Sequence, residues 1–70
     1  MVNWELLDKK IEESGLKRGY IYENLEITRY GWSKKRTRGT DFSVKQIHTL
    51  CKLLNIKSLR EKDEIFFADM

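Results

Sequence analysis

The residues best suited to chemistry lie in one basic block in the middle of the 70-residue chain. Residues 17–40 carry seven Lys and Arg side chains against two Glu, whereas residues 1–16 carry two basic and four acidic side chains. No acidic residue interrupts the block between Ile27 and Thr40. A local excess of positive charge is typical of proteins that bind a polyanion. A solvated helix face is the alternative. Membrane-surface binding is disfavoured, because no broad apolar stripe lies opposite the charges.

The side chains of residues 28–36 are of the types that recognise DNA bases. Helical residues three or four positions apart share a face, so a helix over this segment would gather several of them on one side. The resulting stripe contains Arg29, Ser33 and Arg36, with Tyr30 and Lys34 beside it. Arg and Lys donate to guanine, Ser bonds to either base type, and Tyr contacts a thymine methyl group. Trp32 points away from this stripe, towards a core.

Other kinds of chemistry find little support in the composition. The single Cys51 and the single His48 cannot supply the four ligands of a structural zinc site, so we expect neither metal nor cofactor. One cysteine also excludes an internal disulfide framework. No acid, base and nucleophile are brought together by spacing, which disfavours an enzyme. The apolar runs are too short for a membrane span or a signal peptide, which predicts a cytoplasmic protein.

The elements that must position the basic block are helices. A capping residue followed by apolar residues at helical spacing recurs along the chain, which predicts an all-α fold of five short helices in a single domain over residues 1–70. The predicted N-caps are Asn3, Thr28, Ser43 and Ser58, and the predicted stops of the first and third helices are Gly15 and Gly39. The second helix is expected from about Arg18 to Leu25.

The second and third helices form a predicted helix-turn-helix over about residues 18–36. One helix ends near Leu25, Glu26 and Ile27 form the turn, and Thr28 caps the next helix. At this point the chain resembles the phage Cro/repressor (XRE-type) helix-turn-helix family, in particular the small Cro-like regulators of Gram-positive phages. The resemblance rests mainly on Leu25-Glu26-Ile27-Thr28 at the family's turn and on Trp32-Ser33 in the following helix. It implies a lambda-repressor-like fold.

The resemblance also implies a function and a set of contact residues. It implies a transcriptional regulator of a lysis–lysogeny type of switch, phage-encoded in a bacterial host, that represses by occupying a duplex DNA operator as a homodimer. Its base-reading positions fall on Arg29, Tyr30, Ser33 and Lys34. Its phosphate-contacting positions fall on Arg18, Thr28 and the loop at Thr37–Thr40. The local charge adds Lys17, Lys35, Arg36 and Arg38 to the expected phosphate contacts.

Several residues depart from the family pattern within the motif. Glu26 replaces a usual Gly and Tyr22 a usual Ala, Lys17 stands at the cap of the second helix, and Gly19 weakens that helix. A non-glycine residue at the turn predicts a shifted or loosened motif, because positive φ strains it. These departures motivate an alternative function as an antirepressor, which would bind a companion repressor protein and change its DNA binding.

The last helix carries the apolar run Ile65-Phe66-Phe67. Its spacing predicts that Phe66 and Phe67 close the core over Leu59. Ile65 would then point about 100° away from Phe66. Ile65 would leave apolar surface exposed, so the run Ile65, Phe66 and Phe67 is a candidate patch for a protein partner.

Overall fold

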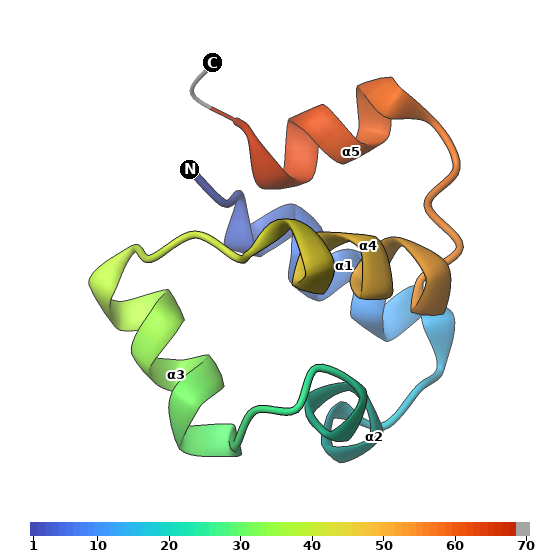
Figure 1. The fold of residues 1–70 in the computed structure, drawn as a ribbon. Coiled ribbons are helices and arrows are strands. Elements are labelled where there is room, and N and C mark those ends of the chain that lie inside the picture. The colour runs from blue at the N-terminus through green and yellow to red at the C-terminus, as the bar shows by residue number, and fades with distance from the viewer. Residues whose placement is uncertain (69–70) are drawn as a thin grey trace.

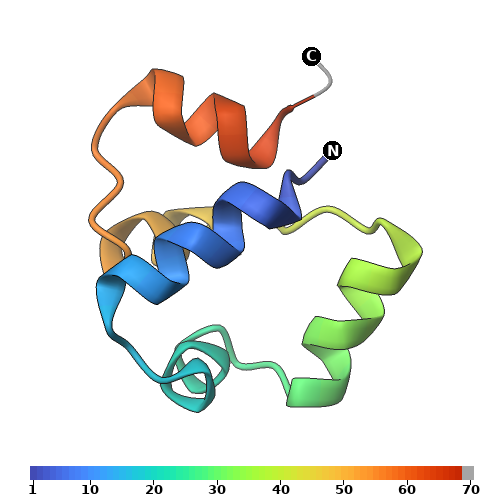
Figure 2. The same ribbon diagram turned by 180° about the vertical axis from the view of Figure 1, so that it is seen from behind.

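The computed structural model describes residues 1–68, in which it contains five α-helices and no strand. The helices are α1 (Trp4–Ser14), α2 (Arg18–Asn24), α3 (Arg29–Arg38), α4 (Val44–Leu53) and α5 (Leu59–Phe66). The predicted all-α class and the five helices are confirmed. Figures 1 and 2 show α5 and α2 at opposite ends of the molecule, with α1 and α4 between them. None of the helices is long and apolar enough to cross a membrane within the described residues.

Side-chain caps begin four of the helices, as the sequence predicts. Each cap accepts a hydrogen bond from the backbone N–H three residues later, and the capping side chains are Asn3, Thr28, Ser43 and Ser58. Gln46 completes a capping box with Ser43. Helix α2 has no such bond at Lys17 and contains Gly19. Because α2 is also only seven residues long, its stability depends on packing against its neighbours.

Two turns of the same kind follow α2 and α4. Among residues 1–68, Glu26 and Asn55 are the two non-glycine residues with positive φ, both at 58°. After α2, the Glu26 N–H donates to Glu23 O and the Ile27 N–H to Tyr22 O, both at 3.1 Å. This is the paired bonding of a Schellman turn. The prediction of a loosened turn is wrong: Glu26 adopts the left-handed conformation, and both backbone bonds close.

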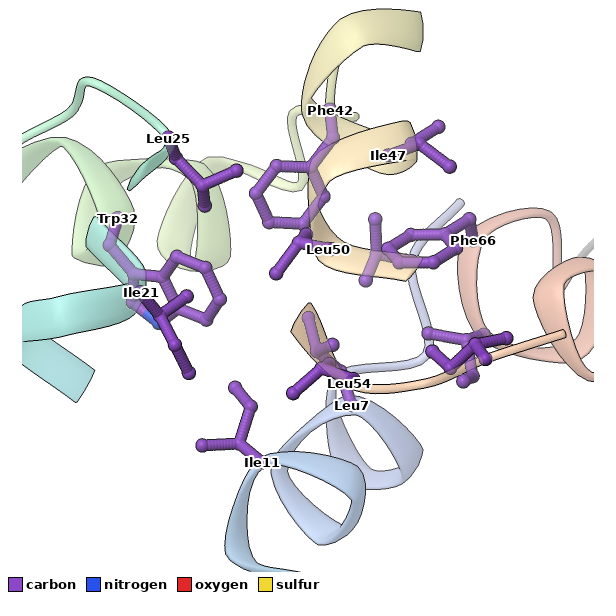
Figure 3. Close-up of a cluster of buried hydrophobic side chains, with 13 residues drawn as sticks. Leu7, Ile11, Ile21, Leu25, Trp32, Phe42, Ile47, Leu50, Leu54 and Phe66 are labelled. Carbon is purple, nitrogen blue, oxygen red and sulfur yellow. The ribbon is translucent and has the colours of Figure 1, made fainter. Parts of the chain in front are cut away.

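The core joins side chains from all five helices, and it contains the rings of Trp32, Phe42 and Phe66 among aliphatic side chains (Figure 3). Trp32 is 2% exposed, which confirms its predicted inward direction. Its ring centroid lies 5.1 Å from that of Tyr22, 5.4 Å from that of Trp4 and 5.5 Å from that of Phe42. The buried Trp32 Nε1 has no hydrogen-bond partner among the described protein atoms.

Helix α5 is rotated relative to the sequence-based expectation. Ile65 and Phe66 are each 1% exposed, Phe67 is half-buried, and Leu59 is 74% exposed. The backbone N–H of Asn3 also donates to the carbonyl of Ile65 at 2.6 Å. The predicted partner patch is therefore wrong for Ile65 and Phe66, which belong to the core. Leu59 does not lie beneath Phe66 and Phe67 but points to solvent.

Candidate nucleic-acid interface

The four residues predicted to read bases lie together on the outer face of α3. Arg29, Tyr30, Ser33 and Lys34 are all exposed, and Tyr30 is 72% exposed. The Lys34 Nζ lies 5.4 Å from the centroid of the Tyr30 ring, as expected for residues four apart on a helix. Among residues 1–68, no ion pair involves Arg29 or Lys34. Within the described residues, this face therefore presents donors and an aromatic ring that no ion pair engages.

The beginning of α3 is fixed by its cap. The Thr28 Oγ1 accepts the backbone N–H of Gly31 at 3.0 Å, while the Thr28 side chain remains exposed. A Cβ at Gly31 would lie 3.4 Å from this oxygen, which is an ordinary van der Waals contact, so the cap does not itself require a glycine there. Since the hydroxyl accepts within the helix, its proton remains available to donate to a phosphate oxygen. Thr28 can thus cap α3 and contact a backbone phosphate.

Arg36, two turns after Arg29 along α3, is held by α1. Its Nη1 and Nη2 donate to the Asp8 Oδ1 and Oδ2 at 3.1 and 2.6 Å. Its guanidinium carbon also lies 5.5 Å from the centroid of the Trp4 ring. The two-point pair and the ring contact give the side chain one defined position. Arg36 therefore joins the end of the basic helix to α1.

Arg18 shares the same carboxylate. Its Nη2 donates to the Asp8 Oδ1 at 3.2 Å, so one acidic group joins α1, α2 and α3. Burial of Asp8 opposes its ionisation, but hydrogen bonds and charge from Arg36, and then from Arg18, outweigh burial and hold the pKa of Asp8 below its ordinary value. Arg18 and Arg36 remain partly exposed, with 39% and 45% of their side chains accessible. A phosphate would share them with Asp8.

Lys35 is also engaged within the molecule. Its Nζ donates to the carbonyl of Asp41 at 3.3 Å and lies 5.4 Å from the centroid of the Phe42 ring. Lys35 is half-buried, in contrast to Lys34 beside it. Its aliphatic stem therefore helps to cover the core, while its ammonium group reaches the segment before α4.

The remaining predicted phosphate contacts are exposed but lie partly outside the expected loop. Thr37 and Arg38 belong to the last turn of α3, and Thr40 follows the left-handed Gly39. The Thr37 Oγ1 donates to the carbonyl of Ser33 at 2.9 Å. Lys17, before α2, is exposed as well. The loop assignment is thus wrong for Thr37 and Arg38, because the helix continues to Arg38.

Asp8 is the important residue that the sequence interpretation missed. Its partners lie 10 and 28 positions later in the chain, beyond the range of any helical spacing rule. One local signal was present: Trp4 and Asp8 are four apart and share a face of α1. That face offers a guanidinium a ring and a carboxylate, but the sequence does not indicate which arginine would arrive.

Comparison with protein-family models, curated proteins and solved structures gives no match to this chain.

Proposed function

We propose that this protein binds duplex DNA as a transcriptional regulator, with α3 lying in the major groove. The observation that carries the proposal is the outer face of α3, where Arg29, Tyr30, Ser33 and Lys34 are exposed together. These types match the donors and the aromatic contact used in direct base readout. The buried Trp32 fixes α3 from behind, which gives the outer face a defined orientation.

The side chains proposed to contact phosphates are of two kinds: some are simply exposed, and others already bind a partner within the molecule. Lys17, Arg38 and Thr40 are exposed, and the Thr28 hydroxyl sits at the start of α3. We assign these as direct contacts to the DNA backbone, which position the helix without reading sequence. Thr37 contributes to the same edge. The tied side chains Arg18, Lys35 and Arg36 contribute mainly through their positive field, because each already has a partner in the molecule.

An NMR titration of backbone amides tests this proposal. A short mixed-sequence duplex is added at ~50 mM and ~200 mM salt, because phosphate contacts weaken steeply over that range. We expect shifts from Thr28 to Thr40 and at Lys17 that fade at the higher salt, while α5 remains unchanged. Selection from a random duplex library then identifies the operator. Absence of shifts at ~50 mM salt would contradict DNA binding.

The Asp8 cluster favours a second candidate, the binding of an acidic surface on a repressor protein. The basic surface of α2 and α3 already holds one protein carboxylate through Arg18 and Arg36. Carboxylates on another protein could engage Arg29 and Lys34 in the same way. The protein would then act as an antirepressor, by covering or altering the DNA-binding surface of its partner.

The two candidates are separated by competition. A candidate companion repressor protein is mixed with the chain and analysed by size-exclusion chromatography, with and without an excess of duplex. A complex that forms only without DNA indicates that both ligands use α3. Loss of the complex in Arg29→Glu, with Arg60→Glu on α5 as the control, would place the partner on the outer face of α3. A complex unaffected by Arg29→Glu would contradict the antirepressor proposal.

A further inference from the structure

An apolar groove of about 620 Å³ lies between α4 and α5, and no residue of α3 belongs to its described lining. Val44 and Leu59, which line it, are 85% and 74% exposed. Half-buried Cys51 and Phe67 and buried Ile56 continue the same lining. Single apolar side chains on a surface are ordinary, but several gathered in one groove are typical of a contact site for another protein. We call this surface the α4–α5 groove.

The charged side chains of the α4–α5 groove have one sign. Lys52, Lys57 and Lys62 line it, and none of the described lining residues is acidic. Among residues 1–68, no ion pair involves any of these three lysines. The carboxylate of Glu61, next to Lys62, is held instead by Lys10 of α1 at 2.9 Å. An occupant of the groove should therefore carry carboxylates around an apolar centre.

The exposure of the groove lining indicates an occupant larger than a small molecule. A small-molecule pocket encloses most of the surface of its ligand. The side chains of Val44 and Leu59, in contrast, lie largely in solvent. An occupant that covers them must lie across the groove, as a segment of a protein does.

Among the ways in which a protein segment binds, the fold favours an α-helix. The described residues form no strand, so no sheet edge is available to an extended peptide. Phe67 is the one Phe, Tyr or Trp residue in the described lining, whereas grooves for proline-rich peptides are lined by several aromatic rings. A helix satisfies its own backbone hydrogen bonds and needs only side-chain contacts with the groove.

The lining of α4 sets the size of that helix. Val44, Ile47 and Cys51 are three and four positions apart, so they lie on one stripe of α4. The ten residues of α4 span ~15 Å. A partner helix of about three turns, with apolar side chains at helical spacing, would cover this stripe.

We propose that the α4–α5 groove binds an acidic amphipathic helix of another protein. The apolar stripe of that helix would pack on Leu59 and Phe67. Carboxylates beside the stripe would pair with Lys52, Lys57 and Lys62, which gives the groove its preference for an acidic partner.

This location leaves the predicted recognition helix free. Both ribbon views place α5 and α2 at opposite ends of the molecule, so the groove beside α5 is remote from the α2 end of the predicted motif (Figures 1 and 2). A helix in the groove and a ligand on the outer face of α3 could therefore be bound together. The inference does not depend on DNA binding, because peptide binding is measured with the protein alone.

A display library of random peptides about three turns long (~12 residues) tests the proposal. The library is selected on the wild type after removal of the peptides that bind Leu59→Asp, in which a charge enters the apolar lining. Leu59 is largely exposed, so this variant should keep its fold, which circular dichroism checks. We expect enriched peptides that carry a net negative charge and apolar residues at helical spacing. No enrichment, or enrichment of basic or non-amphipathic peptides, would overturn the proposal.

The single cysteine reports whether an enriched peptide occupies the groove. Cys51 belongs to the lining, and burial raises the pKa of its thiol, so alkylation by iodoacetamide is followed at mildly alkaline pH. A peptide at ~10 times its Kd should slow the reaction by about tenfold, because the fraction of free protein falls by that factor. An enriched acidic peptide that leaves the rate unchanged binds elsewhere and would contradict the proposal.

Charge reversal separates the groove from general attraction between opposite charges. Lys57→Glu combined with Lys62→Glu should weaken binding of the enriched peptide by about tenfold or more, because like charges then face each other. Lys45→Glu combined with Arg60→Glu changes the same net charge at exposed positions of α4 and α5 outside the groove lining. This control should bind the peptide as the wild type does, and equal weakening in both double variants would defeat the assignment.

Sedimentation velocity and the Cys51 reaction, both without peptide, test a second copy of the chain as the occupant. We expect the reaction rate of Cys51 to be independent of protein concentration. A wild type that dimerises, and whose Cys51 reacts more slowly as it does so, would assign the groove to a second copy and overturn the proposal.

Discussion

The basic residues of α3 differ in what holds their side chains. Arg29 and Lys34, like Tyr30, are exposed and carry no ion pair within the described residues. Arg36 shares the stripe of Arg29 two turns later, yet Asp8 and Trp4 fix its side chain, and Trp32 on the inner side is buried. The sequence alone makes these arginines and lysines look equally available. The difference teaches that positive charge in one short helix can serve two purposes, because some of its side chains stay available to a ligand while another holds the tertiary structure.

Replacing each of the two aromatic residues of α3 by Ala should give the largest difference in the free energy of unfolding. Trp32→Ala should lower the free energy of unfolding by ~3–5 kcal/mol, because it removes a buried ring and leaves a cavity. That loss approaches the whole stability expected of a small domain. Tyr30→Ala should change it by less than ~0.5 kcal/mol, since the ring is exposed. Urea unfolding followed by far-UV circular dichroism measures both, and similar losses would contradict the assignment of the two faces.

On the outer face, Arg29→Ala should affect DNA and not stability. We expect a loss of ~1–3 kcal/mol in binding to the selected operator, with relaxed preference at one base pair. Its unfolding free energy should stay within ~0.5 kcal/mol of the wild type. Arg60→Ala on α5 is the matched control and should leave DNA binding unchanged. If Arg29→Ala weakens all duplexes equally, Arg29 contacts phosphate and does not read a base.

Two turns after Arg29, Arg36→Ala should destabilise the fold. The partly exposed ion pair and the ring contact together contribute roughly 1 kcal/mol. Arg38→Ala, two residues later and exposed at the end of α3, should cost less than ~0.5 kcal/mol. Urea unfolding of the two variants compares a tied arginine with an exposed one in the same helix. Equal stabilities would show that the bonds to Asp8 contribute nothing measurable.

The Asp8 cluster should also make stability depend on pH in the acid range. Arg36 and Arg18 hold the pKa of Asp8 in the folded state below its ordinary value of 3.8. The ionised carboxylate therefore stabilises the fold above about pH 4, and this contribution is lost as the pH falls through the folded-state pKa. Asp8→Asn should be less stable than the wild type near pH 7, and the difference should shrink towards ~pH 2. A difference that is constant with pH would contradict this origin.

A substitution in the turn before α3 should have the smallest effect on the free energy of unfolding, and it should stabilise the fold. Glu26→Gly removes left-handed strain of ~1–2 kcal/mol but adds freedom to the unfolded chain, which leaves a gain of ~0.5–1 kcal/mol. Asn55→Gly, at the equivalent position after α4, should gain less because Asn tolerates this conformation better. Thermal unfolding measures both. A larger gain at Asn55 would contradict the strain assigned to Glu26.

The helices were more predictable from the sequence than the side-chain contacts between them. Caps such as Thr28 and Ser43 act within three residues, so their helices could be located locally. The pairing of Asp8 with Arg36 spans 28 positions, and no local rule selects that partner. In α5, three consecutive apolar residues fit more than one helix face. The exposure of Leu59, and the groove beside it, therefore required the packed structure.

The candidate site was predictable in the same uneven way. The outer residues of α3 follow from helical periodicity, and the structure places them on one face. The resemblance and the local charge also suggested phosphate contacts at Arg18 and Arg36, but they could not show that the carboxylate of Asp8 already binds both side chains. Sequence patterns indicate which side chains can reach a surface. They do not indicate which of these side chains remain free of intramolecular partners.

The edge-to-face contact of Trp4 and Trp32 provides an intrinsic spectroscopic probe of the position of α3. The two indole rings lie 5.4 Å apart at 81°, and Trp32 forms the inner side of α3. Two chromophores this close in a fixed chiral arrangement couple, so they should give a distinct near-ultraviolet circular dichroism signal. Their emission should report the dry environment of Trp32. A ligand that displaces α3 would change this signature without an added label, whereas one that binds only its outer face would leave it intact.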